Sequence, residues 1–453
     1  MKIEALLERK EQLQILILRN LVLQGGTASI NGLREHVQLS KASFDQYLED
    51  IELIGRMMEK KVEVQRNEYQ ALLVLDEDVS LEKILLFLLQ ESLKFKMLVY
   101  LLEHQQVSIV RLATAFNISE SSVFRKIKEL NQLLEEFGLQ IKNGQLYGEE
   151  LQIRYFYYEL FQYIPEDQRP LFLQNTPEKR PFILGLDRVL ETTFTASAEA
   201  QIACWLGITK KRLLNEKSTY ATLKEKKLLY QSDRLYQAID PIIVMHLSRT
   251  AAELNVYETM MFYSFFVSFS IVDPRRLKIK EEKAVGYQIS QINNEWFFFV
   301  GKIEVYERDR LLEQQQKMLG HSLTQLLAKL QETAVQQLPR KRAEDSELSY
   351  LMIQYANVLL MIDFYIAKPV VIGIDLESLP IYRIAFQQYL IRELRGIGGI
   401  EIGSYEEGKE YDLVITFCQR NKKQCEYYLS EFASPYDIIR LKRRIETLKK
   451  EKN

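Results

Sequence analysis

Apolar residues recur at helical spacing through most of the chain, and one predicted helix in the first third carries an unusual polar face. Over 117–134 the apolar positions lie three or four apart, at Val123, Ile127, Leu130 and Leu134. The start of the opposite face carries two small hydroxyls and three cations, at Ser121, Ser122, Arg125, Lys126 and Lys128. This clustering raises the question of what the helix presents to a partner.

The first third of the chain also contains an internal repeat. A shift of 79 positions brings the segment that starts at Ser29 onto the segment that starts at Ser108. In each copy a Ser cap opens a short helix, a three-residue turn ends in a second Ser cap, and a longer amphipathic helix follows. This spacing predicts a helix-turn-helix in both copies.

A hairpin is predicted directly after the second copy. The stretch GLQIKNGQLYGEEL alternates in character around Asn143 and Gly144, and an Asn-Gly pair between such runs is a strong hairpin signal. Apolar helices precede the two copies, at 13–23 and 80–104. We therefore expect two winged helix-turn-helix domains, over 1–70 and 71–160.

The second copy has the residues that a DNA-reading helix needs. A recognition helix enters the major groove with its N-terminus first, where small residues permit close approach and cations meet phosphates and guanine edges. We expect contacts with double-stranded DNA from Arg111, Ser121, Ser122, Arg125, Lys126 and Lys128, and from Lys142 on the wing. The alternative is a solvated face of a protein-interaction module, because winged helices also bind proteins.

The first copy is less suited to DNA. Its second helix begins with Lys41 but continues through Asp45, Glu49 and Asp50, which phosphates repel. Arg34 and Lys41 are its candidate DNA contacts. The pattern leaves open whether this copy touches bases or only supports the other.

The middle of the chain is helical in character. Prolines and charges between Pro165 and Pro181 predict a linker, and apolar residues then recur at three and four positions to about residue 368. Asp273 and Pro274 interrupt this pattern about halfway. We expect two helical-bundle domains, over 175–275 and 280–366.

Each predicted bundle contains one histidine, His246 in the first and His321 in the second. A neutral imidazole is a nucleophile near neutral pH, so either residue is a candidate for phosphorylation. The alternative for each is an ordinary helix residue. His321 follows Gly320 at an apparent helix start, so we expect it to be the more exposed.

At residue 368 the pattern changes to alternating strands and helices. PVVIGID and YDLVITF are continuous apolar strands, with the shorter strand IEIG and a helix over about 380–394 between them. A last helix starts near Ser434. We expect a small doubly wound α/β domain over 368–453, with any ligand around Asp375 to Ser378, although no Gly-rich phosphate loop is present.

Composition narrows the possible classes. The 453 residues include 60 Lys and Arg and 62 Asp and Glu, a net charge of -2, so a case for nucleic acid rests on local charge. The N-terminal residues lack the features of a secretory signal, and no apolar run could cross a membrane. Three scattered cysteines, Cys204, Cys418 and Cys425, form no zinc pattern. We expect a multidomain, mainly α-helical cytoplasmic protein without metal or other cofactor.

In the order of its parts the chain resembles the Mga/AtxA family of virulence regulators from Gram-positive bacteria. The segment LATAFNISESSVFRKIKELNQLLEEFGLQIKNGQLYGEE carries the most specific part of the likeness. The resemblance implies a transcription activator with two phosphotransferase-system regulation domains and a tail like the enzyme II B component. It also implies a homodimer formed through that tail, and histidine phosphorylation by the phosphocarrier protein of the sugar phosphotransferase system.

Two other functions are left open, although we expect no catalytic residues. A relay enzyme of the phosphotransferase system would carry phosphate on a cysteine just after the first strand of the tail, where Ile374, Asp375 and Leu376 stand. An RNA-binding antiterminator also pairs with such regulation domains. Antiterminators usually begin with a small β-rich RNA domain, whereas this chain begins with helices and wings.

Overall fold

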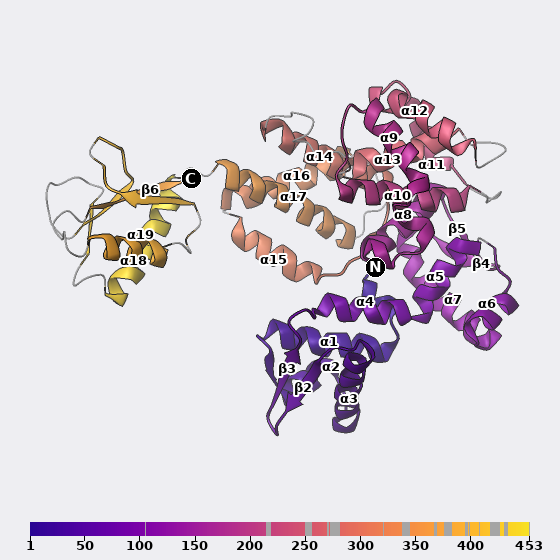
Figure 1. The fold of residues 1–453 in the computed structure, drawn as a ribbon, viewed down its shortest axis with the longest axis horizontal. Helices are drawn as coiled ribbons and strands as arrows, with labels where there is room; N and C mark the ends of the chain where they lie inside the picture. The colour runs from indigo at the N-terminus through magenta and orange to yellow at the C-terminus, as the bar shows by residue number, and fades with distance from the viewer. Residues whose placement is uncertain are drawn as a thin grey trace. The chain divides into compact units, whose positions relative to one another are not determined.

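The computed structural model is mainly helical, with a small parallel sheet near the C-terminus (Figure 1). It describes residues 1–104, 106–213, 219–249, 256–269, 271, 281–319, 321–337, 345–366, 369–375, 383–394, 397, 399–406, 408–416, 426–429 and 434–452. The described chain forms two compact units, Met1–Tyr355 and Ala356–Asn453.

The first winged helix-turn-helix follows a short 3-10 turn, η1 (Ile3–Leu6). Its helices are α1 (Arg9–Leu23), α2 (Ile30–Val37) and α3 (Lys41–Met57). Its strands are β1 (Thr27–Ser29), β2 (Val62–Arg66) and β3 (Gln70–Leu75), antiparallel in the order β1-β3-β2. The expected winged fold is therefore present in this part of the chain.

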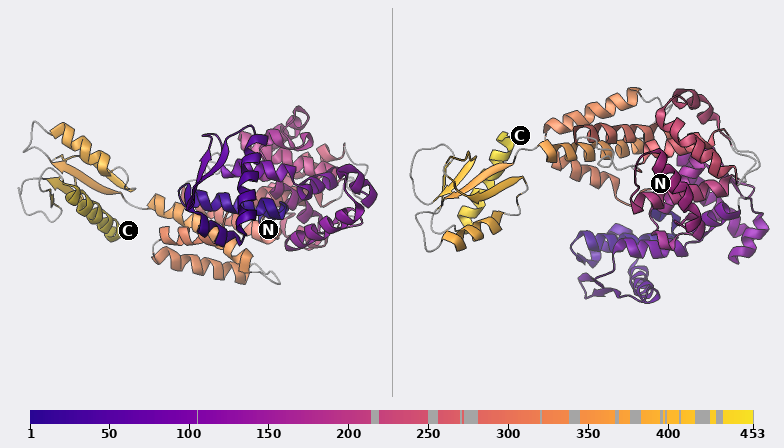
Figure 2. Two further views of the ribbon diagram at one scale, coloured as in Figure 1. Left: turned by 90° about the horizontal axis from the view of Figure 1, so that it is seen from below. Right: turned by 45° about the horizontal axis from the view of Figure 1, so that its top comes forward.

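The second winged helix-turn-helix has two supporting helices in place of the single one expected, α4 (Leu81–Glu91) and α5 (Leu93–His104). The helix-turn-helix itself is α6 (Ile109–Phe116) and α7 (Glu120–Leu134), and a 3-10 turn, η2 (Glu135–Phe137), follows. The wing is the antiparallel pair β4 (Gln140–Lys142) and β5 (Gln145–Tyr147). Helix α4 packs against α1 of the first copy, as the labels of Figure 1 show, and Figure 2 gives two further views of the chain.

The internal repeat is confirmed in the backbone. Helices α2 and α6 begin at residues 30 and 109, and α3 and α7 begin at 41 and 120, so both pairs differ by 79. The hydroxyls of Ser29, Ser40, Ser108 and Ser119 each accept a backbone N–H in the first turn of the helix that follows. The two turns also match, because Gln38 and Asn117 both adopt the left-handed region, with φ of 54° and 52°.

The wing of the second copy is braced at its turn. Asn143 and Gly144 have φ of 51° and 68°, as a two-residue hairpin turn of the expected kind needs. The Val107 N–H donates to the Gly144 carbonyl at 3.0 Å. A Cβ on Gly144 would lie only 1.6 Å from the Val107 carbonyl oxygen, so glycine is required there.

Helix α8 (Glu150–Gln162) joins the second winged domain to the helical region. Every residue from Glu150 to Phe161 is buried, including an arginine and two glutamates. The Arg154 guanidinium donates to Glu150 at 3.0 Å and to both oxygens of Glu258 at 2.6 and 2.9 Å. Arg212 donates to Glu150 at 2.8 Å, which completes a buried chain of four charges.

The described helices of the helical region form two sets along the chain, one before and one after the expected break. The first is α9 (Arg180–Val189), α10 (Ala196–Arg212), α11 (Ala221–Tyr230), α12 (Arg234–Leu247) and α13 (Glu258–Ser268). The second is α14 (Glu281–Phe298), α15 (Arg308–Met318), α16 (His321–Gln337) and α17 (Asp345–Ile366). Helix α13 of the first set packs against α14 of the second. The division into two domains stays a prediction, and the expected break at Asp273 and Pro274 lies outside the described residues.

The linker expected between Pro165 and Pro181 is instead a packed segment. It forms the 3-10 turns η3 (Glu166–Gln168), η4 (Leu171–Leu173) and η5 (Pro177–Lys179), and Leu173 is fully buried. The Lys179 ammonium donates to the carbonyls of Phe172, Gln174 and Ala203. One buried apolar cluster extends from Met1 to Ile303, so the winged domains and the first helices share a core.

The C-terminal unit contains a four-stranded sheet of the expected parallel kind. Its strands are β6 (Val370–Asp375), β7 (Ile400–Ser404), β8 (Leu413–Thr416) and β9 (Glu426–Tyr428), in the order β7-β6-β8-β9. Its helices, α18 (Arg383–Leu394) and α19 (Pro435–Lys452), share one buried cluster with alternate residues of β6. Among the described residues the helices thus cover one face of the sheet, and the doubly wound arrangement stays a prediction for the other.

The buried charges of α8 generate a stability prediction. Glu258→Gln removes the charge that compensates Arg154 without changing the shape of the side chain, so we expect a loss of about 3–5 kcal/mol of stability. The midpoint of thermal unfolding measures this. As a control, Lys96→Ala removes an exposed ion pair with Glu91 and should leave the midpoint unchanged. Equal midpoints for the two variants would contradict the structural role of the charge chain.

Candidate nucleic-acid interface

The front of α7 is a cluster of hydroxyl groups. The Ser119 hydroxyl accepts the Ser122 N–H at 3.2 Å, and the hydroxyls of Ser121 and Ser122 lie 2.9 and 3.0 Å from it. Ser121 is exposed and Ser122 is half-buried. These small side chains leave the first turn of the helix open, with the positive end of its dipole pointing outward.

Exposed cations surround this helix end on three elements. Arg111 lies on α6, Arg125 and Lys128 on α7, and Lys142 on the first strand of the wing. All four side chains are exposed, and none forms an ion pair with any residue that the structure describes. They are therefore available to an anionic partner such as a phosphate backbone.

Lys126 does not belong to this surface, which corrects our expectation. It is only 7% exposed, and its ammonium donates to Glu8 at 2.8 Å and to Glu129 at 3.0 Å. Burial lowers the pKa of Lys126, but its hydrogen bonds to both carboxylates outweigh this and raise it above its usual value. The residue turns toward the start of α1 because Val123 and Leu130 place that side of α7 in the core.

Asn131 fixes the wing to the recognition helix and was not among the residues singled out from the sequence. Its side-chain amide donates to the Ile141 carbonyl at 3.0 Å and accepts the Ile141 N–H at 2.6 Å. Lys142 therefore has a defined position relative to Arg125 and Lys128. The only signal in the sequence was a polar residue one turn before the end of an apolar helix face.

The matching surface of the first copy has the opposite charge. A shift of 79 places Gln46 and Glu49 at the positions of Arg125 and Lys128, and Glu63 at that of Lys142. Arg34 is half-buried, with a buried Nε atom that has no partner among the described residues, and Lys41 is exposed. The matching surfaces of the two copies therefore have the same fold and differ mainly in charge.

The two candidate phosphorylation residues lie apart from this surface. His246 is half-buried on α12, with its ring 4.8 Å from that of Phe182 and its Nε2 atom buried without a partner among the described residues. Burial, with the nearby charges of Lys210 and Arg249, lowers the pKa of His246 to about 4, so the ring is neutral at physiological pH. His321 is the first residue of α16, and its side chain lies outside the described residues.

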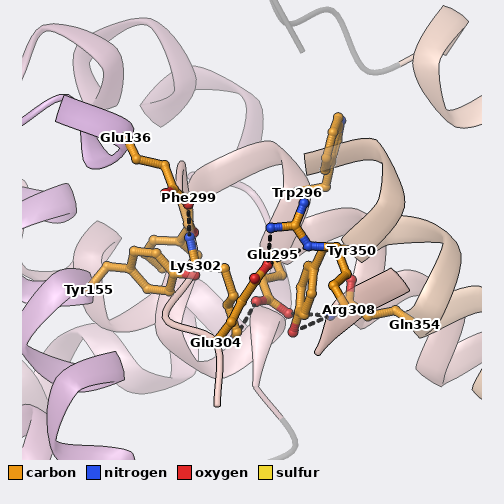
Figure 3. A pocket seen from close by; sticks show the side chains of 11 residues that line it. Glu136, Tyr155, Glu295, Trp296, Phe299, Lys302, Glu304, Arg308, Tyr350 and Gln354 are labelled. Carbon is orange, nitrogen blue, oxygen red and sulfur yellow. Dashed lines mark hydrogen bonds and ion pairs between the residues drawn. The ribbon is translucent and has the colours of Figure 1, made fainter. Parts of the chain in front are cut away.

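A pocket in the first unit was considered as an alternative site (Figure 3). Its charged groups pair with one another. The Lys302 ammonium donates to Glu159 at 2.9 Å and to Glu295 at 3.0 Å, and the Lys302 N–H donates to Glu136 at 3.2 Å. Burial lowers the pKa of Lys302, but the two carboxylates outweigh this and raise it well above its usual value. This pocket is a junction between elements rather than a ligand site.

The described residues offer little for phosphotransfer by the tail. Cys204 lies in α10, where burial raises the pKa of its thiol to about 11, so it is a poor nucleophile. Asp375 ends β6 as expected, whereas Ser378, Cys418 and Cys425 lie outside the described residues. Within the described part of the chain, no group of His, Cys, Asp or Glu side chains could hold a metal ion.

Comparison with known proteins identifies the part of the chain that contains this surface. Residues 77–161 match a family model described as the Mga helix-turn-helix domain. The match covers α4 to α7, the wing and nearly all of α8. A search of curated proteins found no match. Among the described helices, none combines the length and the apolar character that crossing a bilayer requires.

The position of Lys126 generates a prediction that separates it from its neighbour. Lys126→Ala leaves Glu8 and Glu129 without their shared partner, so we expect a loss of roughly 1–2 kcal/mol of stability. Arg125→Ala is the matched control because that side chain is exposed on the same helix turn, and it should not lower the thermal unfolding midpoint. A lower unfolding midpoint for Arg125→Ala than for Lys126→Ala would show that Arg125, and not Lys126, is the residue that stabilises the fold.

Proposed function

With its Mga helix-turn-helix domain the chain belongs to the Mga-like regulator family, and we propose that it is a transcription activator that reads duplex DNA with α7. One observation carries this proposal. Four exposed cations on α6, α7 and the wing, which form no ion pair with any described residue, surround an open, Ser-capped helix end, and the first copy lacks them at the same positions.

The proposed contacts follow from the chemistry of the duplex. Ser121 and Ser122 let the start of α7 approach the floor of the major groove, where Arg125 meets the acceptor edge of guanine. Lys128, Arg111 and Lys142 bind phosphates on either side and set the register. Asn131 supports this binding by holding the wing strand that carries Lys142.

We propose that the first winged domain does not read bases. Its surface carries Asp45, Glu49 and Glu63, of which Asp45 pairs with Arg66 of its own wing. Arg34 and Lys41 remain candidates for contact with the DNA backbone. The acidic side chains would repel phosphates, so any such contact is peripheral.

The helical region is the proposed sensor of the sugar phosphotransferase system. A phosphoryl group passed from the phosphocarrier protein to a ring nitrogen of His246 would gain from the charges of Lys210 and Arg249, which already act on that ring. Because Nε2 is buried, Nδ1 is the proposed acceptor. His321 is the second candidate, at the start of α16.

The C-terminal unit is the proposed site of homodimerisation, like the enzyme II B component that it resembles. Large apolar side chains are exposed on both of its helices, with Ile384 at 78% and Tyr436 at 66%. A partner subunit that covers these side chains would remove them from water. The strand order β7-β6-β8-β9 also agrees with an α/β unit of that class.

DNA binding is tested with Arg125→Ala combined with Lys128→Ala. Because Lys128 would neutralise one phosphate and Arg125 would contact guanine, we expect weaker binding to duplex DNA and a salt dependence of affinity that is shallower by about one unit of slope. A random duplex pool followed by titration at several salt concentrations measures both quantities. Unchanged affinity and slope would refute α7 as the reading helix.

The control for this experiment uses the first copy. Gln46→Ala combined with Glu49→Ala changes the two equivalent positions on α3. This double variant should bind duplex DNA with the affinity and the salt dependence of the unaltered protein. A loss of affinity equal to that of the α7 variant would show that both copies contact the duplex.

Regulation is tested by phosphorylation. We expect the protein to acquire acid-labile phosphate when it is incubated with the phosphorylated phosphocarrier protein, and His246→Ala to abolish this label. His36→Ala is the matched control, because His36 is an exposed histidine on α2. Full labelling of the His246→Ala variant would exclude His246. If the His321→Ala variant then lost the label, the phosphate would be assigned to His321 at the start of α16.

A further inference from the structure

A large aromatic side chain is exposed on the helix that we propose enters the major groove. Phe124 lies between the buried Val123 and the exposed Arg125, and 58% of its surface is accessible. It borders a shallow hollow on α7 that is also lined by Ile127, Lys128, Asn131, Gln132 and Glu135. An aromatic ring left in water forgoes the stabilisation of burial, so its presence calls for a reason.

The fold does not supply that reason. A shift of 79 places Asp45 of α3 at the position of Phe124, and that helix has the same cap and the same core contacts. The core position of the repeat is the one before, with Phe44 in the first copy and Val123 in the second. A small charged residue is therefore compatible with this position, so the winged fold does not require the ring.

The position of Phe124 on α7 would bring its ring close to the floor of the major groove in the proposed complex. It lies in the second turn of α7, next to Arg125 and one turn before Lys128, so it shares the outer side of the helix with two exposed cations. Asn131, one turn further on the same side, ties this part of α7 to the wing. A duplex that engages the cations would therefore bring its bases close to the ring.

We propose that Phe124 is a specificity-determining residue that contacts the 5-methyl group of thymine in the major groove. This inference rests on the proposed function, and it names one feature of the DNA sequence that the protein recognises. The thymine methyl is the only apolar group that the four bases present on the floor of that groove. Contact with it removes both the methyl and the ring from water, which favours duplexes with thymine at that position over all others.

The test replaces thymine by deoxyuridine, which removes only the methyl group. Duplexes are first selected from a random pool with the unaltered protein, and each thymine of the best duplex is then replaced in turn. We expect one replacement to lower affinity about fourfold, the value for one methyl group taken out of water. Phe124→Ala should bind the parent duplex more weakly and should be indifferent to that same replacement, whereas Phe124→Leu should keep part of the discrimination.

Val110→Ala is the matched control. Val110 is another exposed apolar residue, 59% accessible, on the neighbouring helix α6, and its loss should leave the response to deoxyuridine unchanged. Equal responses of the unaltered protein and Phe124→Ala at every thymine would overturn the inference while leaving DNA binding intact. A change of oligomeric state in Phe124→Ala would overturn it in favour of a protein contact. Failure to select any duplex would instead refute the proposed function.

Discussion

The buried chain of charges that centres on Arg154 is the interaction on which the rest of the architecture depends. Arg212, Glu150, Arg154 and Glu258 are each no more than 2% exposed, and they join α8 to α10 and α13. Buried ion pairs contribute little net stability relative to apolar side chains, but a partner in the wrong place is costly. Their effect here is on specificity, because a placement of α8 that separates any of these four groups leaves a buried charge without its partner.

This constraint joins the candidate DNA-binding surface to the helical region. Helix α8 belongs to the Mga-like segment by its sequence match, yet its side chains lie in the core shared with α10 and α13. The junction at Lys302 adds a second connection, because its ammonium donates to Glu159 of α8 and Glu295 of α14. Its backbone N–H donates to Glu136, just after α7 (Figure 3). A displacement of α14 relative to α8 would have to break these charged contacts close to the end of α7. The second winged domain and the helical region are therefore held together by buried contacts and cannot move independently at this junction.

Features set by local sequence could be predicted, and features set by distant residues could not. The repeat, its Ser caps and the Asn-Gly turn each depend on a few neighbouring residues, and all three are confirmed. Lys126 was misplaced because its partner Glu8 lies 118 positions away in the sequence. The segment between Pro165 and Pro181 was taken for a linker because its composition does not reveal the carbonyls that Lys179 binds. Likewise, the exposed cations of the candidate interface could be predicted as charges, but the sequence did not reveal that they have no ion-pair partner among the described residues.

The bracing of the wing turn by Val107 limits how the protein can approach a duplex. In a long, free wing the tip can reach into the neighbouring minor groove, but here Gly144 of the turn is buried against the chain just before α6. Asn143 of the turn and Lys142 on the flank of the hairpin are exposed and remain for contact. Under the proposed function, a single copy of this domain would bind one side of the duplex over a short footprint, so a long recognition sequence would require several such domains along the same helix axis.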